Sequence, residues 1–209
     1  MSVRFNVTMD VEDMEGKTVL VFLKPQNPQH NYMIHAWQVL TASAGATESF
    51  DYDTTISTDV TSTGASPGES ITSERVVVAP GQLLSAISPG GLSPKLQLAP
   101  TSLAQEKLTP TQCGVINQTN PFIQFNSNWY VNDRPVVSMP YVDLNMTVSF
   151  EFEFGSFYFM VASPPMAGQT YIVQNFSDMT QYTMPITATE VDVTLTKDQG
   201  LWTFGFNAS

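Results

Sequence analysis

Basic residues are scarce in this sequence, and those present are scattered singly. Eight Lys and Arg stand against 19 Asp and Glu, so the formal net charge is −11. A nucleic-acid-binding surface needs a basic patch that neutralises phosphates, and attraction to an anionic bilayer needs clustered cations as well. We therefore expect no nucleic-acid partner and no attraction to a membrane by charge alone.

Cysteine and long apolar runs are also nearly absent. Cys113 is the single cysteine, so no intrachain disulfide can form. The longest fully apolar run is only a few residues, whereas a membrane-spanning helix needs about 20. Residues 1–9 alternate polar and apolar side chains and lack the basic start and apolar core of a secretory signal. We expect no transmembrane segment, and a chain that is either cytoplasmic or released without a signal peptide.

Alternation of apolar and polar residues with a period of two is the dominant pattern, and it is typical of half-buried β-strands. It is clearest at 191–195 and 202–206, on either side of a turn at 197–200, which predicts a hairpin. Aromatic residues concentrate after Val115, which predicts that the C-terminal half supplies most of the core. The other predicted strands are 3–9, 18–23, 33–41, 50–54, 73–79, 122–131, 136–139, 142–154 and 157–162.

Together these segments predict an all-β protein, an antiparallel β-sandwich of the jelly-roll or a related type. Residues 59–72 are a loop by composition, and at most one short helix is expected, near 101–108. The Pro- and Gly-rich stretch at about 80–112 predicts a crossover within a single domain, 1–209. Two small β layers, 1–79 and 113–209, are the alternative.

Residues that could support hydrolysis do not form a recognisable constellation. The single Gly-x-Ser-x-Gly match, at 64–68, lies in a stretch that is a loop by composition and not between a strand and a helix, and the two histidines, His30 and His35, are close together in sequence. Glu151 and Glu153 are spaced to share one face of a strand, as a pair of glycosidase carboxylates would, but a solvated strand face explains them equally. We expect no enzyme, and a hydrolase on a sandwich scaffold is the second alternative.

Metal ligands are equally sparse. Cys113 has no second cysteine, and His30 and His35 are spaced to suit neither a helix nor a strand, so zinc is not expected. Asp51 and Asp53, together with Asp59, are weak candidates for a calcium site, as is the acidic turn at 10–15. Acidic turns in so acidic a chain are usually solvated, and we expect no cofactor.

One segment, 126–134, combines aromatic rings with amides and a carboxylate. Sites for sugars and lipid headgroups use this combination, because a ring stacks on an apolar face while amides bond to hydroxyls. The candidate ligand-binding residues are therefore Asn128, Trp129, Tyr130, Asn132 and Asp133. The alternative is that the rings lie in the core and the asparagines form turns. Trp37 and Trp202, at strand positions, are expected in the core.

Short motifs at three places follow one another along most of the chain. They are 36–39 (Ala-Trp-Gln-Val) followed by 50–52 (Phe-Asp-Tyr), 168–173 (Gly-Gln-Thr-Tyr-Ile-Val), and 191–195 (Val-Asp-Val-Thr-Leu) with 201–204 (Leu-Trp-Thr-Phe). In these motifs the chain resembles small β proteins of the rhizobiocin-like family. The resemblance implies a bacteriocin- or toxin-associated role and designates no catalytic residues.

These observations favour a non-enzymatic binding or toxin-like protein that recognises a glycan, a lipid headgroup or a protein surface. Only 13% of the residues are charged, and a neutral polar surface also suits packing into a fibre, shell or crystalline inclusion. A self-assembling structural subunit, and with it a homo-oligomer, is therefore the first alternative. The net charge of −11 opposes such self-association.

Overall fold

The computed structural model describes residues 2–26, 31–63, 68–91, 93–119, 123–151, 153–163, 171–173 and 178–209. Strands dominate these residues, which confirms the prediction of an all-β sandwich-like protein. The chain packs into two compact units: unit 1 holds residues 1–24, 34–54 and 153–209, and unit 2 holds residues 25–33 and 55–152. Each unit combines segments from different parts of the chain, so the units are not the two layers 1–79 and 113–209 of the alternative. The single domain 1–209 stays a prediction.

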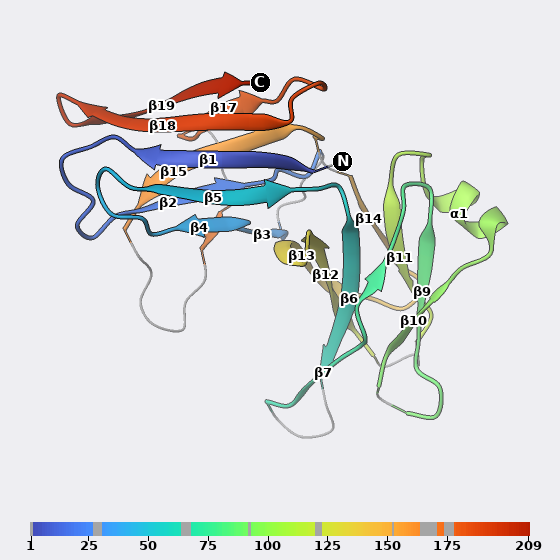
Figure 1. The fold of residues 1–209 in the computed structure, drawn as a ribbon. Helices are drawn as coiled ribbons and strands as arrows, with labels where there is room; N and C mark the ends of the chain where they lie inside the picture. Colours follow the sequence, from blue (N-terminus) through green and yellow to red (C-terminus); the bar gives the residue numbers. More distant parts are fainter. Residues whose placement is uncertain are drawn as a thin grey trace. The chain divides into compact units, whose positions relative to one another are not determined.

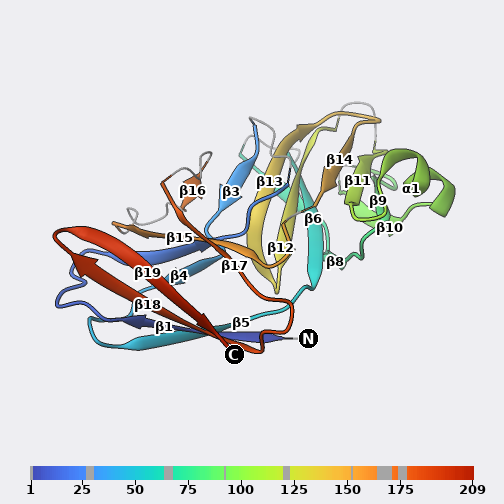
Figure 2. The same ribbon diagram turned by 90° about the horizontal axis from the view of Figure 1, so that it is seen from above.

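Unit 1 is built from two four-stranded sheets (Figures 1 and 2). The first has the order β19-β18-β1-β5 and the second the order β17-β15-β2-β4. Two short strands that belong to neither of these sheets, β3 (Met33–His35) and β16 (Ile172–Val173), pair antiparallel with each other. The strand bounds are β1 Val3–Met9, β2 Thr18–Phe22, β4 Gln38–Leu40, β5 Thr47–Tyr52, β15 Ser156–Ala162, β17 Thr180–Thr183, β18 Glu190–Asp198 and β19 Leu201–Ala208.

Aromatic side chains fill the space between the two sheets of unit 1. In β1 the odd-numbered residues are buried and the others face outward, as the period-two pattern predicts. The Phe5 ring lies 4.7 Å from the ring of Phe157 on the opposite sheet, and Phe159 lies 5.2 Å from Phe206. These centroid distances are those of favourable aromatic pairs. The two sheets therefore pack as a sandwich with an aromatic core.

The hairpin predicted near the C-terminus is confirmed. β18 pairs antiparallel with β19, and Val193 lies opposite Phe206. Gln199 and Gly200 connect the strands with φ of 47° and 87°, the left-handed conformation that a type I′ turn requires at both positions. Most strand pairs are antiparallel, as expected for the predicted sandwich, but β18 pairs parallel with β1 and β9 pairs parallel with β11.

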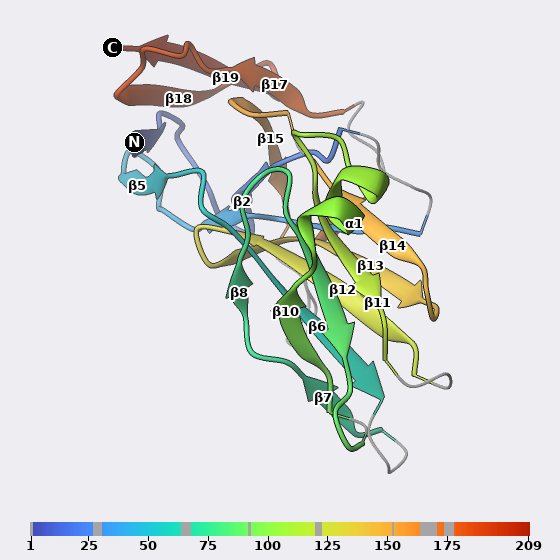
Figure 3. The same cartoon turned by 90° about the vertical axis from the view of Figure 1, so that its right-hand side faces the viewer.

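Unit 2 is likewise a pair of sheets, with one helix (Figure 3). One sheet has the order β10-β9-β11-β14; in the other β13, β12, β6 and β7 follow in order and β8 pairs with β6. Trp129 of β12 stacks on Phe150 of β14 at 5.0 Å, which joins the two sheets. The bounds are β6 Ile56–Thr63, β7 Ser70–Thr72, β8 Val76–Val77, β9 Leu83–Ile87, β10 Lys95–Leu98, α1 Thr101–Lys107, β11 Cys113–Asn117, β12 Phe125–Val131, β13 Arg134–Val142 and β14 Thr147–Phe150.

The middle of the chain is more ordered than its composition suggested. The loop predicted at 59–72 is wrong, because β6 and β7 occupy most of the described part of it. β6 is buried continuously from Ile56 to Val60 and again at Ser62, so this strand is buried through Ser and Thr as well as through apolar residues. The stretch 80–112 forms β9, β10 and α1, and α1 confirms the helix expected near 101–108.

Several predicted strands are shorter or divided. The run at 142–154 is broken by a turn in which the Met146 N–H bonds to the Asp143 carbonyl, and β14 ends at Phe150. The strand predicted at 33–41 is split into β3 and β4. Both halves of the chain supply the core, contrary to the expectation from the aromatic content.

The two tryptophans that were expected in the core, Trp37 and Trp202, are buried to different extents. Trp37 is buried as expected, at 1% exposure. Trp202 is only half-buried, and the Lys197 ammonium lies 4.6 Å from its ring centroid. None of the described residues belongs to a helix with the length and apolarity that crossing a bilayer requires.

The aromatic core of unit 1 gives a stability prediction. Phe5→Ala removes a fully buried ring that contacts both sheets, and large-to-small core substitutions of this kind cost about 3–5 kcal/mol. Ile186→Ala is the control, because Ile186 is 96% exposed and its loss should change stability by less than about 0.5 kcal/mol. Urea unfolding followed by fluorescence measures both, and equal midpoints would contradict an aromatic core at Phe5.

Candidate functional site

The segment predicted to bind a ligand is divided between two faces of β12. Phe125, Ser127, Trp129 and Val131 are buried, whereas the residues between them are half-buried on the opposite face. Trp129 has 0% exposure and its ring stacks on Phe150. Trp129 is therefore a core residue whose ring is covered, which corrects its assignment to the ligand-binding surface. Asn128 and Tyr130 lie on the other face, because successive strand residues point in opposite directions.

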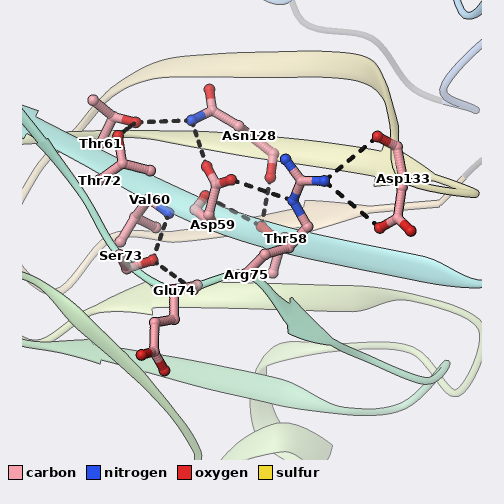
Figure 4. A network of polar contacts seen from close by, with 10 residues as sticks. All are labelled: Thr58, Asp59, Val60, Thr61, Thr72, Ser73, Glu74, Arg75, Asn128 and Asp133. Atoms are coloured by element: carbon pink, nitrogen blue, oxygen red, sulfur yellow. Dashed lines mark hydrogen bonds and ion pairs between the residues drawn. The ribbon is translucent and has the colours of Figure 1, made fainter.

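A buried carboxylate lies on that outer face beside Asn128. Asp59 of β6 is directly opposite Asn128 in the ladder, and its side chain is 5% exposed. The Asn128 amide donates to Asp59 Oδ1 at 2.8 Å and to Thr61 Oγ1 at 3.0 Å. The Thr61 hydroxyl in turn lies 3.0 Å from the Thr72 hydroxyl of β7. The network, shown in Figure 4, links three neighbouring strands through side chains.

Arg75 supplies the positive charge that this carboxylate needs. Its Nε lies 3.5 Å from Asp59 Oδ2, and its Nη1 lies 3.6 Å from Asp133 Oδ1 and donates to the Asp133 carbonyl at 3.4 Å. Its guanidinium carbon is 3.4 Å from the centroid of the Tyr130 ring, a cation–π contact. A buried ion must be paired to be tolerated, so the guanidinium, which sits between the two carboxylates in Figure 4, fixes the connection between β7 and β8 to the sheet.

Tyr130 is held in its neutral form by the same groups. Burial raises the pKa of its phenol, and the negative charge of Asp59 and a hydrogen bond to that carboxylate raise it further. Arg75 acts in the opposite direction. Tyr130 therefore serves as a protonated ring under the guanidinium and not as a general base at neutral pH.

Asn132 and Asp133 form the turn between β12 and β13. Their φ angles are 49° and 60°, a left-handed conformation that Asn and Asp tolerate better than most residues. The Asn132 N–H bonds to the Thr55 carbonyl at 3.0 Å. The Asp133 side chain is 87% exposed even though it contacts Arg75. The turn explains why these two residue types occur here, and a ligand-binding role for them stays a prediction.

A cleft of about 300 Å³ lies beside this network in unit 2. It is lined by Thr72, Ser73, Glu74, Val76, Pro94, Lys95 and Leu96. Ser73 fixes one wall: its N–H donates to the Val60 carbonyl at 2.9 Å, and its hydroxyl accepts from the Val60 N–H at 3.1 Å. In Figure 4 the Glu74 carboxylate points away from the Arg75 network. The connection 73–75 therefore joins the polar network to the cleft.

The residues that organise this site were not predicted as part of it: Asp59 was considered only as a weak calcium ligand, and Arg75 was assigned no role. Asp59 and Arg75 lie far from 126–134 in sequence, and only the pairing of β6 with β12 brings Asp59 to Asn128. β6 is buried at every position from Ile56 to Val60, Asp59 included, so no alternation in burial along this strand assigns Asp59 to the network. Arg75, as a lone cation, gave no signal either.

The other candidate residues do not assemble a catalytic or metal centre within the described parts of the chain. His35 lies in β3, where burial lowers its pKa; His30 lies outside the described residues. The Glu153 carboxylate accepts a hydrogen bond from the Tyr158 hydroxyl at 3.1 Å, and both Glu151 and Glu153 follow the end of β14, so no strand presents them on one face. Burial raises the pKa of the Cys113 thiol to about 12, which makes it a core side chain.

The calcium candidates are dispersed in the same way. Asp51 lies on β5, with its carboxylate 3.8 Å from the Arg4 guanidinium, and Asp53 follows the end of that strand. Of the residues that the structure describes, no three or more His, Cys, Asp or Glu gather in a way that could hold a metal ion.

The Arg75 network gives a second stability prediction. Arg75→Ala leaves the Asp59 carboxylate without its cation, which should cost about 1–3 kcal/mol, less than for a fully buried pair because the Arg75 side chain is 37% exposed. Asp133→Asn removes the exposed partner of the same guanidinium and should cost less than about 0.5 kcal/mol. Chemical unfolding of both variants measures the difference, and a larger loss in Asp133→Asn would be inconsistent with Asp59 as the principal partner.

The raised pKa of Tyr130 gives a pH prediction. The phenol of an unfolded chain titrates near pH 10, and folding raises that pKa, so the unfolded state loses its proton first. The stability that this group contributes is complete below about pH 10 and declines as the pH rises further. Tyr130→Phe keeps the ring and has no proton to lose, so its urea midpoint should fall less than that of the parent protein between pH 8 and about pH 11. Parallel declines would show that Tyr130 is not the group concerned.

The polar groups of the network bond to one another, so the arrangement is suited to holding a surface in place more than to reacting with a substrate. The adjoining cleft is the part of this region with space for another molecule. No family model, no curated protein and no solved structure matches the chain.

Proposed function

We propose that the protein is a non-enzymatic recognition module that binds an extended segment of a partner protein in the cleft of unit 2. The observation that carries the proposal is the position of β10, an edge strand whose first residues, Lys95 and Leu96, line the cleft. β10 pairs with β9, and no second partner strand for it occurs among the described residues. Extended peptides bind such edges by adding a strand to the sheet.

The ladder between β9 and β10 identifies the available backbone groups. The Ala99 N–H bonds to the Leu83 carbonyl at 2.9 Å. Bonded and non-bonded pairs alternate in an antiparallel ladder, so Lys95 and Gln97 also direct their backbone groups toward β9. The N–H and C=O of Leu96 and Leu98 therefore point to the open edge. A peptide paired there would send alternate side chains toward the cleft.

The wall opposite β10 is already in place before a ligand arrives. Ser73 is bonded to Val60 through both its backbone and its hydroxyl, and Arg75 is held by Asp59, Tyr130 and Asp133. Ordering a mobile loop costs binding free energy, and a preformed wall avoids that cost. The polar network thus contributes to recognition indirectly, by keeping residues 72–76 in position.

The chemistry of the cleft favours a polypeptide over a sugar or a lipid headgroup. Its lining includes one acid, one base, two hydroxyl side chains and the apolar Val76, Pro94 and Leu96. Sugar sites depend on an aromatic ring that stacks on the sugar face, and none of the lining residues is aromatic. Lys95 is the single cation, which is a weak basis for binding an anionic headgroup.

Selection from a phage-displayed library of random peptides tests the proposal on the full chain. Selected peptides should bind in solution, and hydrogen exchange of the Leu96 and Leu98 amides should slow in the complex. Leu98→Pro removes one outward donor, and Leu98 is 62% exposed, so the strand should tolerate proline at this edge. We expect binding about tenfold weaker than in the matched control Leu98→Ala, which keeps the donor.

Other results would count against the proposal. A library that yields no binder, combined with binding to a glycan array or to liposomes, would assign the surface to a different ligand class. Peptides that bind Leu98→Pro and Leu98→Ala equally well would show that the β10 edge is not used.

A further inference from the structure

The longest edge strand of the two sheets of unit 1, among the residues that the structure describes, is β19. The Tyr182 ring of β17 stacks on Phe206 at 4.4 Å and the Lys197 ammonium lies over the Trp202 ring, but β17 forms no ladder with β19. Leu201–Ala208 has eight residues without a charge or a proline. Natural proteins usually protect edge strands by making them short or by placing charges and prolines on them. The opposite edge of the same sheet, β5, has six residues that include Glu48 and Asp51. The edges of the second sheet, β4 and β17, have three and four residues.

The backbone groups that β19 directs outward follow from its ladder with β18. Glu190 and Ser209 exchange two N–H to carbonyl bonds, at 3.3 and 3.0 Å, so they form a hydrogen-bonded pair. Every second pair along the hairpin is therefore bonded in the same way, ending with Asp198 and Leu201. The residues between them, Trp202, Phe204, Phe206 and Ala208, direct their N–H and C=O away from β18.

We propose that two copies of the chain associate by antiparallel pairing of β19 with β19, which makes one continuous eight-stranded sheet from two four-stranded ones. Antiparallel pairing of a strand with itself is two-fold symmetric. A symmetry axis at Gly205 places Trp202 opposite Ala208 of the second copy and Phe204 opposite Phe206 of the second copy. This register engages all four outward-directed residues. An axis at Phe204 would leave Ala208 unpaired.

The side chains fit this register on both faces of the extended sheet. The rings of Phe204 and Phe206 lie on the inner face, where they contact Phe159 at 5.5 and 5.2 Å, and pairing joins the two aromatic cores at their rims. On the outer face, Thr203 meets Asn207 of the second copy, and both are uncharged and able to hydrogen-bond. Gly205 meets itself on the axis, where no side chain obstructs the close approach.

The symmetry also limits the assembly to two chains. Each copy uses its one β19 edge once, so the pairing closes as a dimer and does not propagate as a fibre. The net charge of −11 on each chain repels the second copy, and added salt screens that repulsion because the Debye length falls from about 30 Å at 0.01 M to about 3 Å at 1 M. Dimerisation should therefore strengthen as the ionic strength rises. This association does not depend on the cleft of unit 2.

Sedimentation velocity of the full chain, over a range of protein concentration and ionic strength, tests the proposal. We expect a reversible monomer–dimer equilibrium whose Kd falls with added salt. Gly205→Lys sets two ammonium groups directly opposite each other on the axis and should raise the Kd about tenfold or more. The substitution is compatible with the fold, because a Cβ at Gly205 meets only the Thr194 carbonyl, at 3.9 Å, and φ there is not positive.

Gly91→Lys is the matched control, because it makes the same change of charge at a glycine with open space around it. It should dimerise like the parent protein. Ala208→Pro, which removes one outward donor without adding charge, is an independent variant and should also raise the Kd. A parent chain that stays monomeric at millimolar concentration and high salt would overturn the proposal, as would Gly205→Lys and Ala208→Pro proteins that dimerise as well as Gly91→Lys.

Discussion

Successive side chains of a β-strand point to opposite faces of the sheet, and in this protein that constraint determines which residues belong to the core. It sends Trp129 into unit 2 against Phe150 and leaves Asn128 and Tyr130 on the outer face. Along β19 it turns Phe204 toward the interior and exposes Thr203. The same two-residue period sorts the residues of β12 between the core and the polar network, and those of β19 between the inner and the outer face.

That period is also why much of the architecture could be predicted from the sequence. The strand at 3–9, the C-terminal hairpin and the short helix α1 depend on local patterns, and the structure contains all three. The prediction at 59–72 was wrong because Ser and Thr occupy buried positions in β6, so composition concealed the strand. Parallel pairing of β1 with β18 left no signal in either strand.

The candidate site was predictable in part for the same reason. The segment around Asn128 was identified by its residue types, but its organisation depends on Asp59, 69 positions away, and on Arg75. Such contacts arise from the order of strands in the sheet, which local sequence does not encode. Cations are few in this chain, and Arg75 is held by two carboxylates and a ring, while Lys197 lies over Trp202. The positions of these two cations are explained by partners that the fold brings near them, not by their neighbours in sequence.

The pairing of β1 with β18 has a consequence for folding during translation. β1 pairs with β5 on one side, but on the other side Arg4 lies opposite Glu190, so this second neighbour is synthesised only after all of unit 2. Residues 25–33 and 55–152, which make up unit 2, are complete well before that moment. Until then one edge of β1 lacks its ladder partner β18, and pairings so distant in sequence form slowly. An unpaired strand edge is prone to aggregate, so this edge of β1 is a segment that a chaperone would shield during translation.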